Sequence, residues 1–299
     1  MQNFYGHGKL LLTAEYLVLL GAEALALPCR FGQSLRIESS ENNVLHWKSY
    51  THDDQLWFEA EFRLNNLECI KTSNPQFSDR LRGLLLNIQK LKPDFLNEGI
   101  VAKTVLEFDR SWGLGSSSTL VANLGAWAGV NPYDLLKNSF GGSGYDLACA
   151  EADGPICYTL NDDRPMYNRV PFNPIFKEDL YFVYRNQKQS SEKEIAAFQK
   201  KIISPEMIHQ VNQITQALLK CSSKSEFNQL LLEHEILMSS ILGRDTIQES
   251  IFPNFKGQLK SLGAWGGDFI LASGDASSPE YFYSKGYNTV IPYQEMILG

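Results

Sequence analysis

The order of apolar and polar residues predicts a β-rich first third of the chain. Apolar and polar residues alternate at positions 44–50 and 56–64, as in strands that bury one face. The predicted strands cover residues 9–12, 16–20, 24–39, 44–50 and 56–64. A polar turn at residues 52–54 separates the last two, so we expect them to form a hairpin.

Helical spacing first appears after this region. Apolar residues from Phe77 to Leu91 recur every three or four positions, and Pro93 ends the predicted helix. Residues 100–108 then alternate as a strand. A loop rich in glycine and serine leads from this strand into a second predicted helix, which extends to about residue 128.

The second half of the chain combines short strands with amphipathic helices. Ser204 and Ser223 are predicted helix N-caps, and Pro205 stands at a first helical position. The other predicted elements are strands at 181–184, 258–262, 269–272 and 288–291 and a helix at 279–285. This order predicts an α+β fold, with a β-rich N-terminal lobe and a C-terminal lobe of helices and sheet.

Charge and composition narrow the function classes. The 299 residues carry a formal net charge of −7, which argues against a general nucleic-acid binder or a protein of anionic membrane surfaces. No apolar stretch of the sequence reaches the ~20 residues needed to span a bilayer. Five cysteines without a C-x-x-C pair suit a reducing compartment. We therefore expect a cytoplasmic protein that binds neither nucleic acid nor membrane.

The first of three glycine clusters joins a predicted strand to a predicted helix. It consists of Gly113-Leu114-Gly115-Ser116-Ser117-Ser118. Glycines let the backbone approach a ligand closely, and the amides at a helix N-terminus attract phosphate. The serine hydroxyls could bond phosphate oxygens or ligate Mg²⁺. Two interpretations are open: a phosphate-binding loop, or a capped helix start without a ligand.

The other two clusters are ambiguous when each is taken alone. Asp146 follows the second cluster, at residues 141–144. A carboxylate there can accept a proton from a substrate hydroxyl or cap the next helix, and the residues alone favour the cap. The third cluster lies between two predicted strands and by itself predicts a tight turn. It consists of Gly263, Ala264, Trp265, Gly266, Gly267 and Asp268.

Together, the order of these loops resembles the GHMP kinase superfamily, which includes galactokinase and the homoserine, mevalonate and phosphomevalonate kinases. Four segments carry the likeness, in the family's order: residues 8–21 (G-K-x-x-x-x-G-E-[HY], with Ala14 for the glycine), 113–118 (G-L-G-S-S-[AS]), 143–148 (S-G-x-D-x-A) and 260–268 (K-x-x-G-A-G-G-G-[GD]). The matching segments extend over nearly the whole chain.

The resemblance implies a two-lobed fold, with a ribosomal protein S5 domain 2-like lobe at residues 1–172 and a ferredoxin-like lobe at 173–299. It implies an ATP- and Mg²⁺-dependent phosphotransferase of isoprenoid biosynthesis, either a monomer or a homodimer. The γ-phosphoryl group of ATP would pass to a small-molecule acceptor, mevalonate or phosphomevalonate. A diphosphomevalonate decarboxylase-like enzyme and a non-catalytic ligand-binding or regulatory protein are the alternatives.

The same likeness implies roles for single residues. The loop at 113–118 would hold the ATP phosphates, with Ser117 as a ligand of Mg²⁺. Asp146 would take or orient the acceptor's proton, Lys9 would stabilise the developing charge, and Glu15 would brace these groups. The third-motif and substrate loops would contribute Gly263, Ala264, Gly266, Gly267, Asp268 and Lys188.

Besides Ala14, two further features depart from the family pattern. Trp265 replaces a glycine, so its indole could narrow the site, stack on a ligand or mark a loss of nucleotide binding. The glutamate that ligates metal in relatives has no clean equivalent, and Asp134 is the nearest acid.

Overall fold

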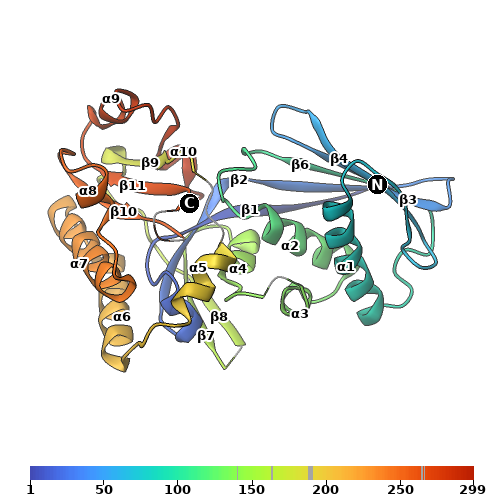
Figure 1. Cartoon of the computed structure of the whole chain (residues 1–299), viewed down its shortest axis with the longest axis horizontal. Helices are drawn as coiled ribbons and strands as arrows, with labels where there is room; N and C mark the ends of the chain where they lie inside the picture. Colours follow the sequence, from blue (N-terminus) through green and yellow to red (C-terminus); the bar gives the residue numbers. More distant parts are fainter. Residues whose placement is uncertain (140, 163, 188–190, 264, 266) are drawn as a thin grey trace. The chain divides into compact units, whose positions relative to one another are not determined.

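The computed structural model describes residues 1–139, 141–162, 164–187, 191–263, 265 and 267–299 (Figure 1). The chain forms two compact units. Unit 1 consists of Met1–Gly8, Phe31–Arg110 and Leu114–Glu151, and unit 2 consists of Lys9–Arg30, Ser111–Gly113 and Ala152–Gly299. The lobes expected at residues 1–172 and 173–299 remain a prediction.

Unit 1 is a β-sheet with helices on one face. Its strand order is β5-β4-β3-β6-β2, and the β3–β6 pair is parallel. The strands are β3 (Val44–Tyr50), β4 (Leu56–Arg63), β5 (Cys69–Thr72), β6 (Ile100–Leu106) and the C-terminal part of β2 (Ala24–Ser39). Buried and half-buried residues alternate along β3, as the sequence predicts for a strand with one covered face.

The helices of unit 1 cover the apolar face of this sheet. They are α1 (Pro75–Leu91), α2 (Ser116–Ala128), α3 (Pro132–Lys137) and α4 (Tyr145–Glu151). Trp47 and Phe62 of the sheet share one core with Leu85, Leu124 and Leu147 of the helices. Burial of these side chains fixes α2 and α4 against the sheet, and both helices begin at a predicted functional loop.

Unit 2 contains a four-stranded antiparallel sheet in the order β10-β11-β9-β12. Its strands are β9 (Leu180–Tyr184), β10 (Gln258–Ser261), β11 (Phe269–Ser273) and β12 (Val290–Pro292). Every residue of β9, β10 and β11 is buried, although β10 is an edge strand. A second group of strands joins Ala24–Ala26 of β2 to β7 (Ile156–Asn161) and β7 to β8 (Arg164–Arg169).

The helices of unit 2 follow the predicted capping signals. Ser204 and Ser223 accept hydrogen bonds from Met207 N–H and Glu226 N–H, so they cap α6 and α7 as predicted. The helices are α5 (Ser191–Phe198), α6 (Pro205–Lys220), α7 (Lys224–Leu242), α8 (Ile247–Ser250), α9 (Ser278–Tyr283) and α10 (Tyr293–Met296). In the described part of the chain, none of the helices is both long and apolar enough to cross a bilayer.

One predicted strand is wrong. The first strand, β1, spans Gln2–Leu11, but residues 16–20 do not form a strand, and Leu17–Leu20 is a short 3₁₀ helix instead. Ala14 and Tyr16 have positive φ angles of 63° and 60°, which turn the chain sharply on both sides of Glu15. The apolar residues of this segment are explained by the burial of Leu17 and Val18 in a tight turn.

Candidate active site

The glycine–serine loop enters α2 as the sequence predicts. Gly115 is the N-cap of α2, with a φ of 93°, and Leu114 beside it is buried. Ser118 donates a hydrogen bond to Gly115 O at 2.9 Å, which closes the first turn, while the Ser117 side chain is exposed. The first amides of an α-helix have no intrahelical acceptor, so this turn presents N–H groups and a hydroxyl to a ligand.

Gly113 connects three of the motifs. Its carbonyl oxygen accepts a hydrogen bond from Lys9 Nζ at 3.1 Å. On its other side, a Cβ atom added to Gly113 would overlap the carboxylate of Asp268, and the φ of 66° is itself unfavourable for other residues. The lysine of the first motif, the first glycine of the loop and the acid of the third motif therefore meet within unit 2.

A buried group of charges lies behind the first motif. Lys260 Nζ forms an ion pair and hydrogen bond with Glu15 and lies 3.4 Å from Glu235 Oε1. The side chains of Lys260 and Glu15 are 0% and 1% exposed, so this ammonium compensates two carboxylates away from water. Burial raises the pKa of Glu15 to about 7, against the lowering effect of Lys260. Burial also raises the pKa of Glu235.

His234 completes this group from the buried face of α7. Its Nε2 accepts the Ala14 N–H at 3.0 Å and lies 3.2 Å from Glu15 Oε2. Burial, and then the nearby Lys260, keep the pKa of His234 well below its usual range, so the ring is neutral. A neutral ring that accepts at Nε2 holds its proton on Nδ1. His234 thus fixes the turn that carries Glu15.

Asp146 lies in the first turn of α4, on unit 1. Its Oδ1 accepts the Leu147 N–H at 3.1 Å. Asp146 is itself a helical residue, so it is not the N-cap that the residues alone favour. The side chain is half-buried, and α4 packs against α2, the helix that begins at the glycine–serine loop. Lys9 belongs to unit 2, and its predicted approach to Asp146 remains a prediction.

Comparison of the sequence with known proteins finds no match, whereas comparison of the structure finds several. No family model and no curated protein matches the sequence. Solved structures match over nearly the full chain. Mevalonate kinase from Methanococcus jannaschii is 16% identical with a TM-score of 0.68, over 97% of this chain and 96% of that one. Galactokinase from Lactococcus lactis, solved with galactose, is 14% identical with a TM-score of 0.71, over 100% and 93%.

A third similar structure is phosphomevalonate kinase from Streptococcus pneumoniae, in complex with phosphomevalonate and AMPPNP. It is 16% identical with a TM-score of 0.68, over 95% of this chain and 96% of that one. The chain has the GHMP kinase fold. The predicted α+β class and the predicted likeness are confirmed, and identities of this size establish the fold alone.

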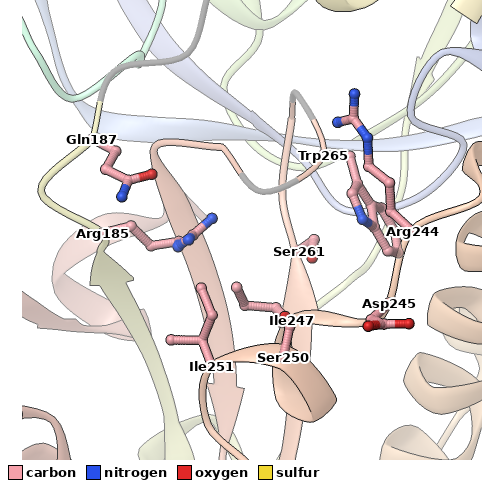
Figure 2. A pocket seen from close by; sticks show the side chains of 9 residues that line it. All are labelled: Arg185, Gln187, Arg244, Asp245, Ile247, Ser250, Ile251, Ser261 and Trp265. Carbon is pink, nitrogen blue, oxygen red and sulfur yellow. The ribbon is translucent and has the colours of Figure 1, made fainter.

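The third motif shows how this chain departs from the GHMP kinase pattern. The main-chain N–H of Trp265 donates to the Tyr16 hydroxyl at 2.7 Å, and the side chain of Trp265 is buried at one wall of a pocket (Figure 2). Gly263 has a φ of 66° and Gly267 is buried. Three further predicted site residues lie outside the described residues: Ala264, Gly266 and Lys188.

The described residues contain no group of three or more His, Cys, Asp or Glu side chains that could hold a metal ion. Asp134 is exposed in the first turn of α3. Mg²⁺ in phosphoryl-transfer enzymes is bound largely through substrate phosphates and one or two protein oxygens. The exposed Ser117 hydroxyl fits that limited role.

Two residues of the buried group, Lys260 and Glu235, were not predicted from the sequence to be site residues. Lys260 is the first residue of the third-motif segment at 260–268, and this position was the signal that could have marked it as a site residue. Glu235 follows His234 on the apolar face of α7, where two adjacent buried polar residues would have indicated a partner from elsewhere in the fold.

Proposed function

We propose that this protein is an ATP-dependent small-molecule kinase of the GHMP type. The observation that carries the proposal is the environment of Gly113, which lies between Lys9 and Asp268 at the entrance to α2. A glycine is required there by φ and by space, and the next residues supply the amides of a helix N-terminus. Such a loop suits the phosphates of a nucleotide.

The residues of the loop would act by positioning and by charge neutralisation, which dominate phosphoryl transfer. The first amides of α2 would bind phosphate oxygens, and the hydroxyl of Ser117 would ligate Mg²⁺. Mg²⁺, when bound, neutralises charge on the phosphate oxygens. Lys9 would stay fixed near the loop through its hydrogen bond to Gly113 O.

Asp146 would serve the acceptor. An oxygen of the acceptor, from a hydroxyl in mevalonate or from the phosphate in phosphomevalonate, would attack the terminal phosphorus as the bond to the ADP oxygen breaks. The proton of a hydroxyl acceptor would pass to Asp146. The Leu147 N–H bond holds Asp146 Oδ1 and limits its rotation, so the acid is preoriented. Lys9 would stabilise the charge that develops on the transferred group.

The acceptor we propose is mevalonate or phosphomevalonate. Support comes from kinases of both compounds among the similar structures, and from Glu15-Tyr16 and Asp268, which resemble the phosphomevalonate kinase motifs. The galactokinase likeness widens the acceptor panel to sugars. The buried Trp265 in a glycine-rich loop favours one alternative, a non-catalytic protein that retains the fold.

ADP release tests the proposal. MgATP is supplied with a panel of mevalonate, phosphomevalonate, diphosphomevalonate and sugars, and the product is identified by mass. We expect phosphorylated product from one acceptor, and a 10²- to 10⁴-fold lower rate in Asp146→Asn with MgATP binding retained. Asp153→Asn, which changes an exposed acid, is the matched control and should keep the wild-type rate.

Two outcomes would contradict the kinase proposal, and a third would contradict the role of Asp146 within it. Release of CO₂ from diphosphomevalonate would indicate the decarboxylase-like alternative. Absence of any thermal shift with millimolar MgATP would favour the non-catalytic protein. A near-normal rate in Asp146→Asn would remove the role assigned to that carboxylate.

A further inference from the structure

Gln33 of β2 lies on the covered face of the unit 1 sheet, where an apolar residue is expected. The same face of β2 continues through Leu35 and Ile37, which belong to the hydrophobic core of unit 1. Gln33 is only 4% exposed, and its main chain pairs with Leu106 of β6, so the sheet fixes its position. A buried amide side chain needs hydrogen-bond partners, and the element that supplies them is tied to the strand.

Two partners of Gln33 come from α2. Thr119 Oγ1 donates to Gln33 Oε1 at 2.8 Å, and Asn123 Nδ2 donates to Gln33 O at 2.9 Å. Thr119 and Asn123 are four positions apart, so they lie on one face of the helix, and each is 1% exposed. The side chain and the main chain of one strand residue therefore hold two successive turns of α2.

Thr119 also closes the turn that would bind phosphate. Its main-chain N–H donates to Gly115 O at 2.9 Å, and its Oγ1 lies 3.1 Å from Ser116 O. The amides of residues 116–118 come before this bond, at the end of the helix where N–H groups have no intrahelical acceptor. A displacement of Thr119 would therefore change the direction in which these amides point.

The backbone of β1 packs directly against the same part of the chain. A Cβ atom added to Gly8 would lie 3.0 Å from Leu114 O, and one added to Gly6 would lie 3.4 Å from Thr119 Cα. Close packing of this kind limits how far the turn can move, but it depends only weakly on direction. The hydrogen bonds to Gln33 are directional, so they fix how the turn is oriented.

We propose that Gln33 is a positioning residue for the first turn of α2. Through Thr119 and Asn123 it sets the direction of the amides at 116–118, and it does not touch the nucleotide itself. Matched polar partners can be replaced by apolar groups of the same shape at little cost in stability, so orientation explains this buried contact better than stability does. The proposal rests on the proposed kinase function, which assigns the phosphates to this turn.

Gln33→Met removes the side-chain contact and keeps its approximate shape. The Thr119 hydroxyl then still has Ser116 O as an acceptor, so the free energy of unfolding in urea should stay close to that of the wild type. Calorimetry with Mg²⁺–AMPPNP should show at least about tenfold weaker binding, as expected when one charged hydrogen bond is lost. In ¹⁵N-serine-labelled protein without nucleotide, the amide NMR signals of residues 116–118 should move.

Three further variants distinguish orientation from stability. Asn123→Leu removes the second bond and should also weaken nucleotide binding, even if Gln33→Met fails to fold. Thr119→Ser keeps the hydroxyl and should retain the wild-type affinity. Thr104→Val is the matched control, because it breaks another buried hydroxyl bond of unit 1, 2.9 Å from Thr104 Oγ1 to Ser49 Oγ. It should lower stability but change neither the affinity nor the serine amide signals.

The outcomes separate this proposal from the kinase proposal. Wild-type affinity in folded Gln33→Met and Asn123→Leu, equal weakening in Thr104→Val, or amide signals that do not move in Gln33→Met would overturn the positioning role. A wild-type protein that does not bind Mg²⁺–AMPPNP would contradict the kinase proposal. The amide signals, which are measured without nucleotide, would then still decide whether Gln33 orients the turn.

Discussion

Glu15→Gln tests the buried charge group that supports the first motif. Gln keeps the size and hydrogen-bonding ability of Glu15 but removes its titration. Burial raises the pKa of Glu15 in the folded protein from 4.5 to about 7, whereas the unfolded chain has the ordinary value. The folded state therefore holds this proton more tightly than the unfolded state does.

The sign of the effect follows from this difference. The contribution of Glu15 to stability is fully present below pH 4.5 and is lost as the pH rises through 7. Each pKa unit is equivalent to about 1.4 kcal/mol, so between pH 5 and 8 the wild type should lose about 2–3 kcal/mol relative to Glu15→Gln. Glu235 and His234 are present in both proteins, and the comparison between the two isolates Glu15.

Urea unfolding of both proteins at pH 5, 6, 7 and 8 measures this difference. Glu68→Gln changes an exposed, paired acid and should show no comparable pH trend. A difference between wild type and Glu15→Gln that stays flat, or that moves in favour of the wild type as the pH rises, would refute a raised Glu15 pKa. It would mean that Lys260 keeps Glu15 ionised throughout this range.

Two further substitutions test the contacts around the loop and the buried group. Lys260→Met leaves two buried carboxylates without their ammonium and should lower the free energy of unfolding by about 3–5 kcal/mol. The loss should be larger at pH 8 than at pH 5, because the acids take up protons at pH 5. Equal stability to the wild type would contradict the ion pairing. Gly113→Ala places a methyl group against Asp268 at a positive φ, so it should lower the free energy of unfolding by more than about 1 kcal/mol, measured by thermal unfolding. It should also weaken MgATP binding, measured by calorimetry. Gly83→Ala, in open space on α1, is the matched control and should stabilise by about 0.5–1 kcal/mol; a comparable loss in both variants would remove the special role of Gly113.

Local patterns were sufficient to predict the elements that carry strong apolar periodicity. The strand at 24–39, the hairpin after it and the helix that begins at the glycine–serine loop were predicted, and the structure confirms them. The hairpin strands have one covered face and the helix begins at a glycine turn, so their own residues specify them. The caps at Ser204 and Ser223 belong to the same class of short-range signal.

Elements with weak local signals were missed. Among the described residues, strand β8 is largely exposed, contains Pro165 and pairs along β7, and its sequence has no apolar alternation to detect. The segment at 16–20 failed for a different reason, because its apolar residues are buried in a turn that positive φ angles at Ala14 and Tyr16 create. Backbone conformations of that kind leave no mark in hydrophobic spacing.

The candidate site also has a part that short-range sequence signals predict and a part that they do not. The motif letters located the glycine–serine loop and Asp146, because those residues are neighbours in the sequence. The contact between Glu15 and Lys260 joins residues 245 positions apart, and the pocket beside Trp265 gathers side chains from separate elements. Only the folded chain brings such residues together.

Transfer of label from γ-³²P-labelled ATP tests the central claim most directly. Wild-type protein and Asp146→Asn are incubated with Mg²⁺ and each acceptor of the panel, and labelled product is separated from ATP. The account predicts labelled acceptor with the wild type and almost none with Asp146→Asn, although both proteins bind MgATP. Binding of MgATP by the wild type without transfer to any acceptor, or equal transfer by both proteins, would contradict it.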